Sequence, residues 1–283
     1  MEFEVITANY NNSKFLDDFF SSIIDSSIKP KKIIFVDDCS TDNSIEIVKK
    51  YQEKNEVEIE LILNEKNLGF ANSLNLAITH LTSLYFARLD PDDSVLLNRF
   101  EVQLNYLINN SSIYLVGSNV NYILNGEYKK SSDVLLNEKE IINKIKKGIL
   151  PIIHGSIMGK TEILNGFKYK QELVPAEDYD LFAFIVSKGF RISNLKDQLT
   201  LVTIHENSVS NDLKFSTIKK RFKLAEDYFG YKKSFLGSYF EYIHQLNYRR
   251  YLFENSYKRY FYLIISASVM PYKTFNKLFK KII

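Results

Sequence analysis

The run RLDPDD at residues 88–93 places three carboxylates, those of Asp90, Asp92 and Asp93, within four residues. Carboxylates this close repel one another, so a shared buried position requires a cation or a strong set of hydrogen-bond donors. Oxygen ligands suit Mg²⁺ or Mn²⁺ rather than zinc, and such an ion usually completes its shell with water and substrate phosphates. The run therefore predicts a divalent metal site that binds a phosphorylated ligand. The alternative is a solvated, Asp-rich turn in which Pro91 fixes the backbone.

Two further places carry side chains that could do chemistry. Glu177 and Asp178, in the motif AEDYDL, open a predicted helix. Acidic residues at a helix start often serve only as partners of the helix dipole. His205 follows a predicted strand, where a histidine is more often a hydrogen-bonded structural residue than a ligand. Both alternatives stay open on the sequence alone.

Alternating strands and helices are expected to position these residues. Apolar runs and helical spacing predict strands at 3–8, 32–36, 58–63 and 84–89 and helices at 15–28, 44–51, 70–81 and 96–109. This alternation favours a parallel, doubly wound sheet, in which ligands bind beyond the carboxyl ends of the strands. The polar clusters at 9–12, 37–42 and 90–93 all follow strands, so we expect them to line one pocket.

The second part of the chain has a less regular pattern. We expect a strand and turn at 113–125, helices at 138–147 and about 177–188, and a last strand at 199–204. No GxGxxG follows the first strand and no GxxxxGK[ST] occurs anywhere. Side chains and a metal would therefore have to hold the phosphates of a bound nucleotide.

Composition limits the class of protein. The 283 residues are 45% hydrophobic and 25% charged, which is typical of a folded globular chain. A single cysteine, Cys39, excludes an intrachain disulfide and a multi-cysteine metal site, as expected in a reducing compartment. No basic segment followed by an apolar stretch marks a secretory signal, and the longest apolar run, 260–270, is shorter than the roughly 20 residues that span a bilayer. We therefore expect a cytoplasmic protein without a transmembrane helix.

The charge is concentrated toward one end. Residues 213–283 hold 15 Lys and Arg against 4 Asp and Glu, although the whole chain has a net charge of only +3. Basic residues alternate there with aromatic ones, as in helices that lie in a membrane interface. A helical cap on the preceding domain and an oligomer contact are the alternatives. No nucleic-acid-binding module is recognisable, so we expect no nucleic-acid partner.

Together these motifs resemble those of the family 2 glycosyltransferases, which are inverting, metal-dependent enzymes with the GT-A fold. The resemblance covers residues 3–210 and is carried, in order, by VITANYN, IIFVDDCSTDNS, NEKNLGFANSLNLAI, ARLDPDDSVLLNRFEVQ, HGSIMGKTEIL, AEDYDL and IHENSVS. It implies a Rossmann-like, mostly parallel central α/β sheet flanked by helices, with a C-terminal helical extension. The chain looks most like bacterial enzymes that build capsule, O-antigen or lipooligosaccharide.

The same resemblance implies a domain organisation and a reaction. A catalytic domain would span 1–212, with a nucleotide-sugar half at about 1–110 and an acceptor half at about 111–212, before a basic, aromatic-rich helical region at 213–283. The enzyme would move a hexose or N-acetylhexosamine from a UDP-sugar to a hydroxyl of a saccharide or lipid-linked acceptor, at the inner face of the plasma membrane. The alternatives are an inactive nucleotide- or glycan-binding protein and a nucleotidyltransferase.

Individual residues take roles from the resemblance. It implies that Asp178 is the catalytic base and that Asp92 and His205 hold Mn²⁺ or Mg²⁺. It implies donor binding, with Asp38 at the base edge and Asp90 near the ribose, by Ala8, Asn9, Asp38, Asn67, Gly69, Arg88 and Asp90. It gives supporting positions to Asp93, Glu177 and His154.

The sequence departs from the family pattern in two places. Asn9 stands where a small hydroxyl residue is common, and Asn72 and Ser73 stand where many members have Ala-Arg. By the resemblance, the second departure puts in question the cationic contact that this helix makes to the diphosphate in those members. Lys66 or Arg88 could supply that charge instead.

Overall fold

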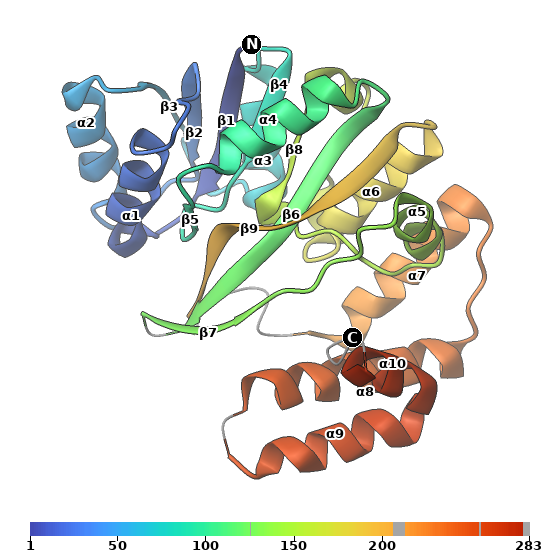
Figure 1. Ribbon diagram of the computed structural model, residues 1–283. Helices are drawn as coiled ribbons and strands as arrows, with labels where there is room; N and C mark the ends of the chain where they lie inside the picture. Colours follow the sequence, from blue (N-terminus) through green and yellow to red (C-terminus); the bar gives the residue numbers. More distant parts are fainter. Residues whose placement is uncertain (125, 206–212, 255, 280–283) are drawn as a thin grey trace.

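One nine-stranded sheet organises the computed structural model, which describes residues 1–124, 126–205, 213–254 and 256–279 (Figure 1). The strands are β1 (Phe3–Asn9), β2 (Lys32–Asp37), β3 (Glu58–Leu63), β4 (Tyr85–Arg88), β5 (Ser94–Val95), β6 (Ile113–Leu124), β7 (Glu127–Ser131), β8 (Met158–Lys160) and β9 (Arg191–Ile204). Their order across the sheet is β3-β2-β1-β4-β8-β6-β9-β5, and β7 pairs with β6 outside this path.

The first half of the sheet is built from parallel strands. β3, β2, β1 and β4 pair in parallel, and β6 and β9 form a further long parallel pair. Parallel neighbours need a crossover, which is supplied by α1 (Ser13–Ile24), α2 (Ser44–Lys54) and α3 (Phe70–Thr79). The pairs made by β8, β7 and β5 are antiparallel. The expected α/β architecture, with helices flanking the sheet, is confirmed.

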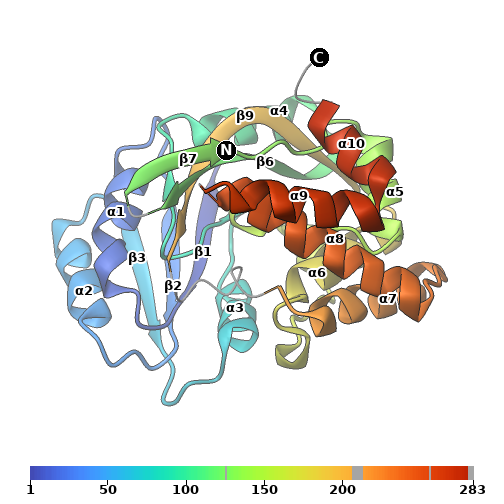
Figure 2. The same ribbon diagram turned by 90° about the horizontal axis from the view of Figure 1, so that it is seen from below.

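Helices cover both faces of the sheet, and neighbouring strand residues serve opposite faces. Val5 and Phe35 belong to the apolar cluster that contains α1, α2 and α4 (Arg99–Asn109). Ile6 and Val36 belong to the cluster that contains α3, α5 (Glu138–Lys146) and α6 (Glu177–Ser187). Figure 2 shows α1 and α2 on one side of β1–β3 and α3 and α6 on the other. Burial on both faces explains why these strands are continuous apolar runs.

The basic C-terminal region is helical, as expected. It contains α7 (Phe215–Phe229), α8 (Phe235–Phe253), α9 (Lys258–Val269) and α10 (Pro271–Phe279). The helix α7 packs on α6, where the Tyr228 hydroxyl donates to Asp180 Oδ1 at 2.8 Å. The helices α8, α9 and α10 follow outward from α7 (Figure 1).

Several element boundaries differ from the sequence predictions. The helix expected from residue 96 begins at Arg99, because Ser94 and Val95 pair with β9 as the short strand β5. The last strand begins at Arg191 rather than at 199. Its first part was not predicted because the exposed polar residues 196–198 interrupt the apolar pattern. The strands β7 and β8 were not predicted. Residues 206–210 of the motif IHENSVS, and the expected boundary at 212, lie outside the described residues.

Candidate functional site

The acidic loop 90–93 is fixed between β4 and β5. Carboxylate oxygens of Asp90, Asp92 and Asp93 all lie within 4.8 Å of one another. Because β5 pairs with β9, the loop meets the end of β9. There the Thr203 N–H donates to Asp93 Oδ1 at 3.0 Å, and His205 Nε2 lies 2.9 Å from Asp92 Oδ2. The two predicted metal ligands are thus brought together across more than 100 residues of chain.

The charges of the loop are only partly balanced. Arg88 is buried, and both terminal nitrogens of its guanidinium contact the two carboxylate oxygens of Asp90. Burial raises the pKa of Asp93 well above its ordinary value, and the neighbouring charges of Asp92 and Asp90 raise it further. Burial likewise raises the pKa of Asp92, with His205 opposing the shift. A cation at this loop would relieve the repulsion.

A glycine lets a second segment approach the acidic loop. The strand β8 runs antiparallel to β4, so the short 3₁₀ helix η1 (His154–Ser156) faces residues 88–90. A Cβ atom on Gly155 would lie 3.1 Å from Asp90 Oδ2 and 3.2 Å from Asp93 Oδ2. Any larger residue would therefore crowd the carboxylates.

The buried residues Arg99 and Gln103 of α4 hold the backbone of the end of β4 and of η1. Arg99 is fully buried, and its Nη2 donates to the Arg88 carbonyl at 2.8 Å. Its neighbour Gln103 donates to the Ser156 carbonyl at 2.7 Å. Burial lowers the pKa of Arg99 to about 9, while the charge of Asp93 opposes that change. Sequence reasoning did not single out Arg99 or Gln103, although both lie in the motif ARLDPDDSVLLNRFEVQ.

A second polar cluster lies at the ends of β1 and β2. Asn9 Nδ2 donates to Asp37 Oδ2 at 2.9 Å. Asp38 Oδ1 accepts hydrogen bonds from Asn64 Nδ2 and the Leu68 N–H, both at 2.7 Å, and Asp38 Oδ2 accepts from the Gly69 N–H at 2.8 Å. Asp38 therefore holds the loop 64–69 in place. A carboxylate can accept further hydrogen bonds, so its contact with a nucleobase stays a prediction.

The same loop contains most of the remaining predicted donor residues. Ala8 is buried on β1, whereas Asn67 and Lys66 of the loop are exposed. Gly69 has a φ of +87° and so needs glycine, and a Cβ there would collide with the Gln171 side chain. The Oε1 atom of Gln171 accepts from the Ala71 N–H at 3.0 Å, a contact that the sequence gave no reason to expect.

The two residues that replace the usual Ala-Arg pair have structural contacts. Asn72 Nδ2 donates to the Leu68 carbonyl at 2.8 Å, and Ser73 Oγ accepts from Asn64 Nδ2 at 2.9 Å. Arg88, one of the two suggested substitutes for the missing cation, is paired with Asp90.

His154 is buried beside the acidic loop and is neutral. Its Nε2 lies 2.8 Å from the Tyr169 hydroxyl. Burial lowers the pKa of His154 well below its ordinary value, and the charge of Arg88 lowers it further. Its neighbour Tyr169, which sequence reasoning missed, is tied to α3 because its N–H donates to Asn75 Oδ1 at 2.8 Å.

Two acidic residues at the start of α6 face this centre. Burial raises the pKa of Glu177 to about 7, the charge of Asp178 adds to this, and the charges of Arg88 and Asp90 also act on it. Among the described residues, Glu177 Oε2 is buried without a hydrogen-bond partner. Burial also raises the pKa of Asp178, whose Oδ1 accepts from the Tyr179 N–H at 2.6 Å. Glu177 is therefore poised to hold or release a proton near neutral pH.

The C-terminal helices supply a cation to this acidic pair. Arg221 of α7 is 8% exposed, and its charge opposes the effect of burial on the pKa of Asp178. Its Nη2 donates to Gln245 Oε1 at 2.8 Å, and Gln245 donates to Glu241 Oε1 at 3.0 Å. Glu241 in turn pairs with Lys233 and Lys273. Sequence reasoning missed Arg221, because the basic residues around it give no sign of which one is buried.

Comparison with known proteins finds a family and several relatives. The family model described as Glycosyl transferase family 2 matches residues 4–167. The uncharacterized glycosyltransferase MJ1057 of Methanocaldococcus jannaschii is 33% identical over 223 residues, which cover 77% of this chain and 74% of that protein. The putative glycosyltransferase EpsE of Bacillus subtilis is 31% identical, covering 69% and 70%. The amylovoran biosynthesis glycosyltransferase AmsE of Erwinia amylovora is 26% identical, covering 78% and 84%.

Solved structures share the fold. The S. aureus TarS 1-349 complex with UDP-GlcNAc matches with a TM-score of 0.61 at 19% identity, covering 95% of this chain and 72% of that one. The mannosyltransferase PcManGT from Pyrobaculum calidifontis, in complex with GDP-Man and Mn²⁺, matches with a TM-score of 0.59 at 15% identity, covering 95% and 73%. The expected GT-A fold is confirmed.

The buried Glu177 carboxyl predicts a pH dependence of stability. Its pKa of about 7 in the folded chain lies above the ordinary value of 4.5, so folding favours the protonated form. The stability that this proton gives is present below pH 4.5 and is lost as the pH rises through 7. Wild type loses this stability as the pH rises, whereas Glu177→Gln, which cannot ionise there, does not. The free energy of unfolding of Glu177→Gln minus that of wild type should therefore increase by about 2 kcal/mol from pH 5 to pH 8. Urea denaturation at both pH values measures this difference.

The matched control is Glu172→Gln, which changes an exposed glutamate a short distance before α6. It should follow the wild-type pH dependence. Parallel curves for Glu177→Gln and wild type would show that the Glu177 carboxyl ionises normally.

Proposed function

The chain belongs to glycosyl transferase family 2, and on this premise we propose that it is an inverting, metal-dependent enzyme that transfers a sugar from a UDP-sugar. The acceptor would be a hydroxyl of a saccharide or lipid-linked glycan in the synthesis of a surface polysaccharide. The observation that carries the proposal is the acidic loop 90–93 facing the carboxyl pair of Glu177 and Asp178. One cluster fits a metal and a diphosphate, and the other fits proton transfer.

The residues of the acidic loop fit Mn²⁺ or Mg²⁺. Three carboxylates converge within 4.8 Å, and burial together with the charges of Asp92 and Asp90 raises the pKa of Asp93, so a cation between them would be stabilising. Hard oxygen ligands match these two ions. Asp92 and His205 would hold the ion, which when bound would act as a Lewis acid on the diphosphate oxygens. One of the similar structures is titled as a complex with Mn²⁺.

The proposed donor pocket is formed by the ends of β1 and β2. Asn9 and Asp38 are buried there, and Asp38 fixes the backbone of the loop 64–69. A fixed loop would orient the nucleoside, so that the sugar meets the acceptor in a constant geometry. The choice of UDP is supported by the TarS complex with UDP-GlcNAc, whereas the PcManGT complex contains GDP-Man.

Asp178 is the proposed general base. It would take the proton of the acceptor hydroxyl as the new glycosidic bond forms. Burial raises its pKa toward the range in which a base is effective, and Arg221 favours the charged form that accepts the proton. No second carboxylate is needed as a nucleophile, so displacement in one step would invert the anomeric carbon. An α-linked donor would then give a β-linked product.

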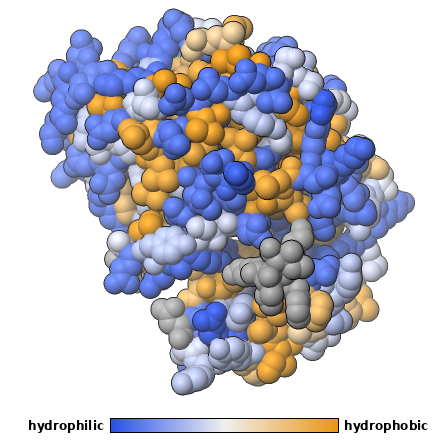
Figure 3. Space-filling model, in the orientation of Figure 1, coloured by the Kyte–Doolittle hydropathy of each residue, from blue (hydrophilic) through white to orange (hydrophobic). Residues whose placement is uncertain are grey.

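Contact with an anionic membrane surface is the proposed role of the outer helices. Tyr257, Phe261 and Ile264 are 92%, 63% and 66% exposed, and their spacing places them on one face at and along α9. The exposed basic residue Lys258 flanks this face. Figure 3 shows hydrophobic and hydrophilic side chains side by side over the region of α8–α10. Such a surface fits the headgroup region of an anionic leaflet.

In the part of the chain that the structure describes, no helix combines the length and the apolar character needed to cross a bilayer.

Substitutions at the two acidic centres should separate binding from transfer. We expect Asp178→Asn to lower kcat about 10²- to 10⁴-fold while the KM for the UDP-sugar changes little, because only the base is lost. Asp92→Asn should abolish the metal-dependent part of turnover. Release of UDP from a panel of UDP-sugars measures both, and Asp197→Asn, on an exposed part of β9, is the control. Near-normal turnover of Asp178→Asn would refute its role as base.

Nucleotide binding gives a test that needs no acceptor. We expect UDP with Mn²⁺ to raise the melting temperature, because a ligand that binds only the folded chain stabilises it. GDP, CMP and TDP, and UDP with EDTA, should shift it little. A shift that is indifferent to metal would argue against the role given to Asp92 and for a nucleotide-binding protein without catalysis.

Membrane contact can be tested with vesicles. We expect the wild-type chain to sediment with phosphatidylcholine vesicles that contain phosphatidylglycerol, and only weakly with pure phosphatidylcholine. The double variant Phe261→Glu, Ile264→Glu should bind at least about tenfold more weakly. Two apolar side chains that would enter the membrane are lost, and two negative charges are added that the anionic lipids repel. Tyr128→Glu, an equally exposed position on β7, should bind as wild type. Unchanged sedimentation of the double variant would exclude α9 as the contact.

A further inference from the structure

The segment 169–174, called the strap below, joins α3 to the start of α6. It contains the 3₁₀ helix η3 (Gln171–Leu173), and it ends shortly before Glu177, the first residue of α6. The helix η3 contacts both α3 and α6. The strap is therefore a direct connection between the donor side of the proposed centre and the helix that carries the proposed base.

Hydrogen bonds fix the strap to α3. Asn75 Nδ2 donates to the Tyr169 carbonyl, and the Tyr169 N–H donates to Asn75 Oδ1, both at 2.8 Å. The Ala71 N–H, at the start of α3, donates to Gln171 Oε1 at 3.0 Å. The first N–H groups of a helix have no partner inside the helix, so Gln171 supplies one from the strap. A movement at the start of α3 would therefore move the strap.

Gln171 also lies against the loop 64–69. A Cβ atom on Gly69 would fall 2.4 Å from Gln171 Cδ, so the carboxamide packs directly on the backbone of this glycine. The Gly69 N–H in turn donates to Asp38 Oδ2 at 2.8 Å. Contacts thus run without interruption from Asp38, the residue predicted to bind the nucleobase, to the strap.

The other end of the strap is joined to α6 and α7. The Ala176 N–H, directly before α6, donates to the Leu173 carbonyl at 2.7 Å. Lys220 of α7 donates to two strap carbonyls, at 2.6 Å and 3.0 Å. Asp178 is the second residue of α6. A displaced strap would therefore displace the proposed base.

The side chain of Tyr169 extends from the strap into the acidic centre. Its hydroxyl lies 2.8 Å from Nε2 of His154, beside the acidic loop. Burial raises the pKa of Tyr169, and the charge of Arg88 opposes that rise. The charges of Glu177 and Asp178 add to it, so the ring faces the acidic pair. The strap therefore lies against both acidic centres.

We propose that Asn75 and Gln171 are positioning residues, which couple the loop 64–69 through the strap to α6 and so keep Asp178 in line with a bound donor. The inference rests on the proposed function for the roles of Asp38 and Asp178. Neither positioning residue has to touch a substrate. Misplacement of a reacting group by about 1 Å can cost about 10²-fold in rate, so contacts outside the centre can control transfer.

Hydrogen exchange of the full chain, with and without UDP and Mn²⁺, tests the coupling. We expect the ligand to slow exchange in the loop 64–69 and, by at least about fivefold, at residues 176–182. Gln171→Met keeps the length of the side chain but loses the acceptor oxygen. It should keep the protection of the loop, and exchange at 176–182 should then slow less than about twofold. Gln171→Glu, which keeps the oxygen, should restore the wild-type pattern.

Turnover gives a second measurement. Gln171→Met and Asn75→Leu should lower kcat about tenfold or more at saturating UDP-sugar, while the KM for the donor changes less than about threefold. The loop 64–69 keeps its hydrogen bonds to Asp38 in both variants, which is why donor binding should persist. Gln171→Glu should recover most of kcat. If Asn75→Leu does not fold, Gln171→Met alone decides.

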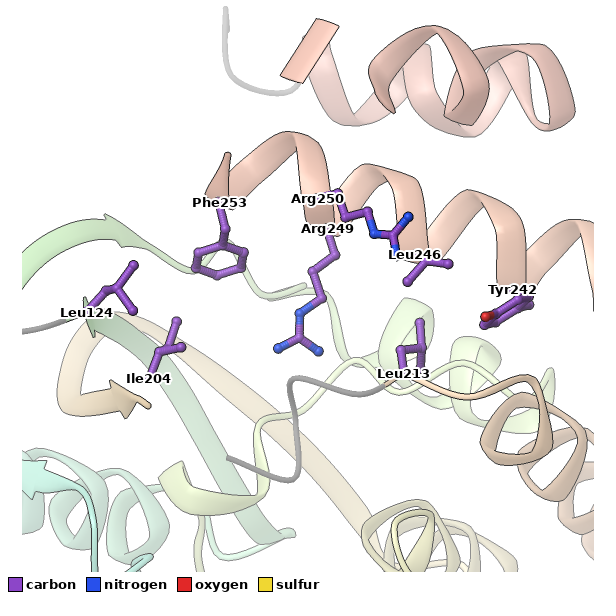
Figure 4. A pocket seen from close by; sticks show the side chains of 8 residues that line it. All are labelled: Leu124, Ile204, Leu213, Tyr242, Leu246, Arg249, Arg250 and Phe253. Atoms are coloured by element: carbon purple, nitrogen blue, oxygen red, sulfur yellow. The ribbon is translucent and has the colours of Figure 1, made fainter. Parts of the chain in front are cut away.

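Two control variants separate coupling from stability. Glu172→Gln changes an exposed side chain of the strap and should behave as wild type. Leu246 of α8 lines a cavity of about 260 Å³ between α8 and the ends of β6 and β9 (Figure 4). Leu246→Ala enlarges this cavity and should lower the melting temperature without changing the protection at 176–182. Loss of that protection in Leu246→Ala would show that stability, and not the strap, controls it.

The proposal is overturned if UDP protects 176–182 equally in wild type and Gln171→Met, or if protection in wild type stops at the loop 64–69. Normal kcat in Gln171→Met, together with loss of kcat in Asp178→Asn, would remove the strap and leave the glycosyltransferase. Normal kcat in Asp178→Asn would remove the base, and absence of any protection by UDP with Mn²⁺ would remove the donor. The last two results would end the inference together with the proposed function.

Discussion

Repulsion among three carboxylates is the constraint around which the neighbouring segments are arranged. Carboxylate oxygens of Asp90, Asp92 and Asp93 lie within 4.8 Å of one another, and Asp93 is buried while Asp90 and Asp92 are half-buried. Each carboxylate has a different partner. Asp90 contacts the Arg88 guanidinium, Asp92 contacts His205, and Asp93 accepts a hydrogen bond from a backbone N–H of β9. These partners come from β4, from β9 and from the residue that follows β9. The loop therefore keeps its shape only while β4 stays in the sheet and β5 stays paired with β9.

The C-terminal helices contribute a charged residue to the acidic pair on α6. Arg221 brings a buried positive charge to Asp178, and Gln245 and Glu241 connect that arginine to α8. Glu241 binds Lys273, so a series of polar contacts runs from α10 to Arg221, whose charge acts on Asp178. The helix α9, which carries the exposed aromatic face, packs against α8 and α10. The basic region is therefore part of the structure around the acidic pair, to which it contributes Arg221.

Much of this architecture was accessible from sequence because its signals are local. Continuous apolar runs marked the four parallel strands, and the acidic loop was recognisable from the spacing of its carboxylates. Arg221 was missed because its importance depends on which of several adjacent basic residues is buried. Arg99 and Gln103 were missed for the same reason, since a buried arginine inside a helical pattern has the appearance of an exposed one. The strand β9 was predicted to begin only at residue 199 because polar residues interrupt its apolar pattern; its pairing with β6 shifts register at these residues and then continues.

The long separation between the acidic loop and its partners also determines when the centre can form. Thr203 is 110 residues beyond Asp93, and His205 is 113 residues beyond Asp92. During synthesis the parallel strands β1 to β4 can assemble early, since they use mostly neighbouring segments. The acidic loop, in contrast, lacks its partners Thr203 and His205 until β9 and the residue after it have left the ribosome. Binding of the proposed ion would therefore come late in folding, and a truncated translation product that ends before β9 would carry the acidic motif without the partners that shape it.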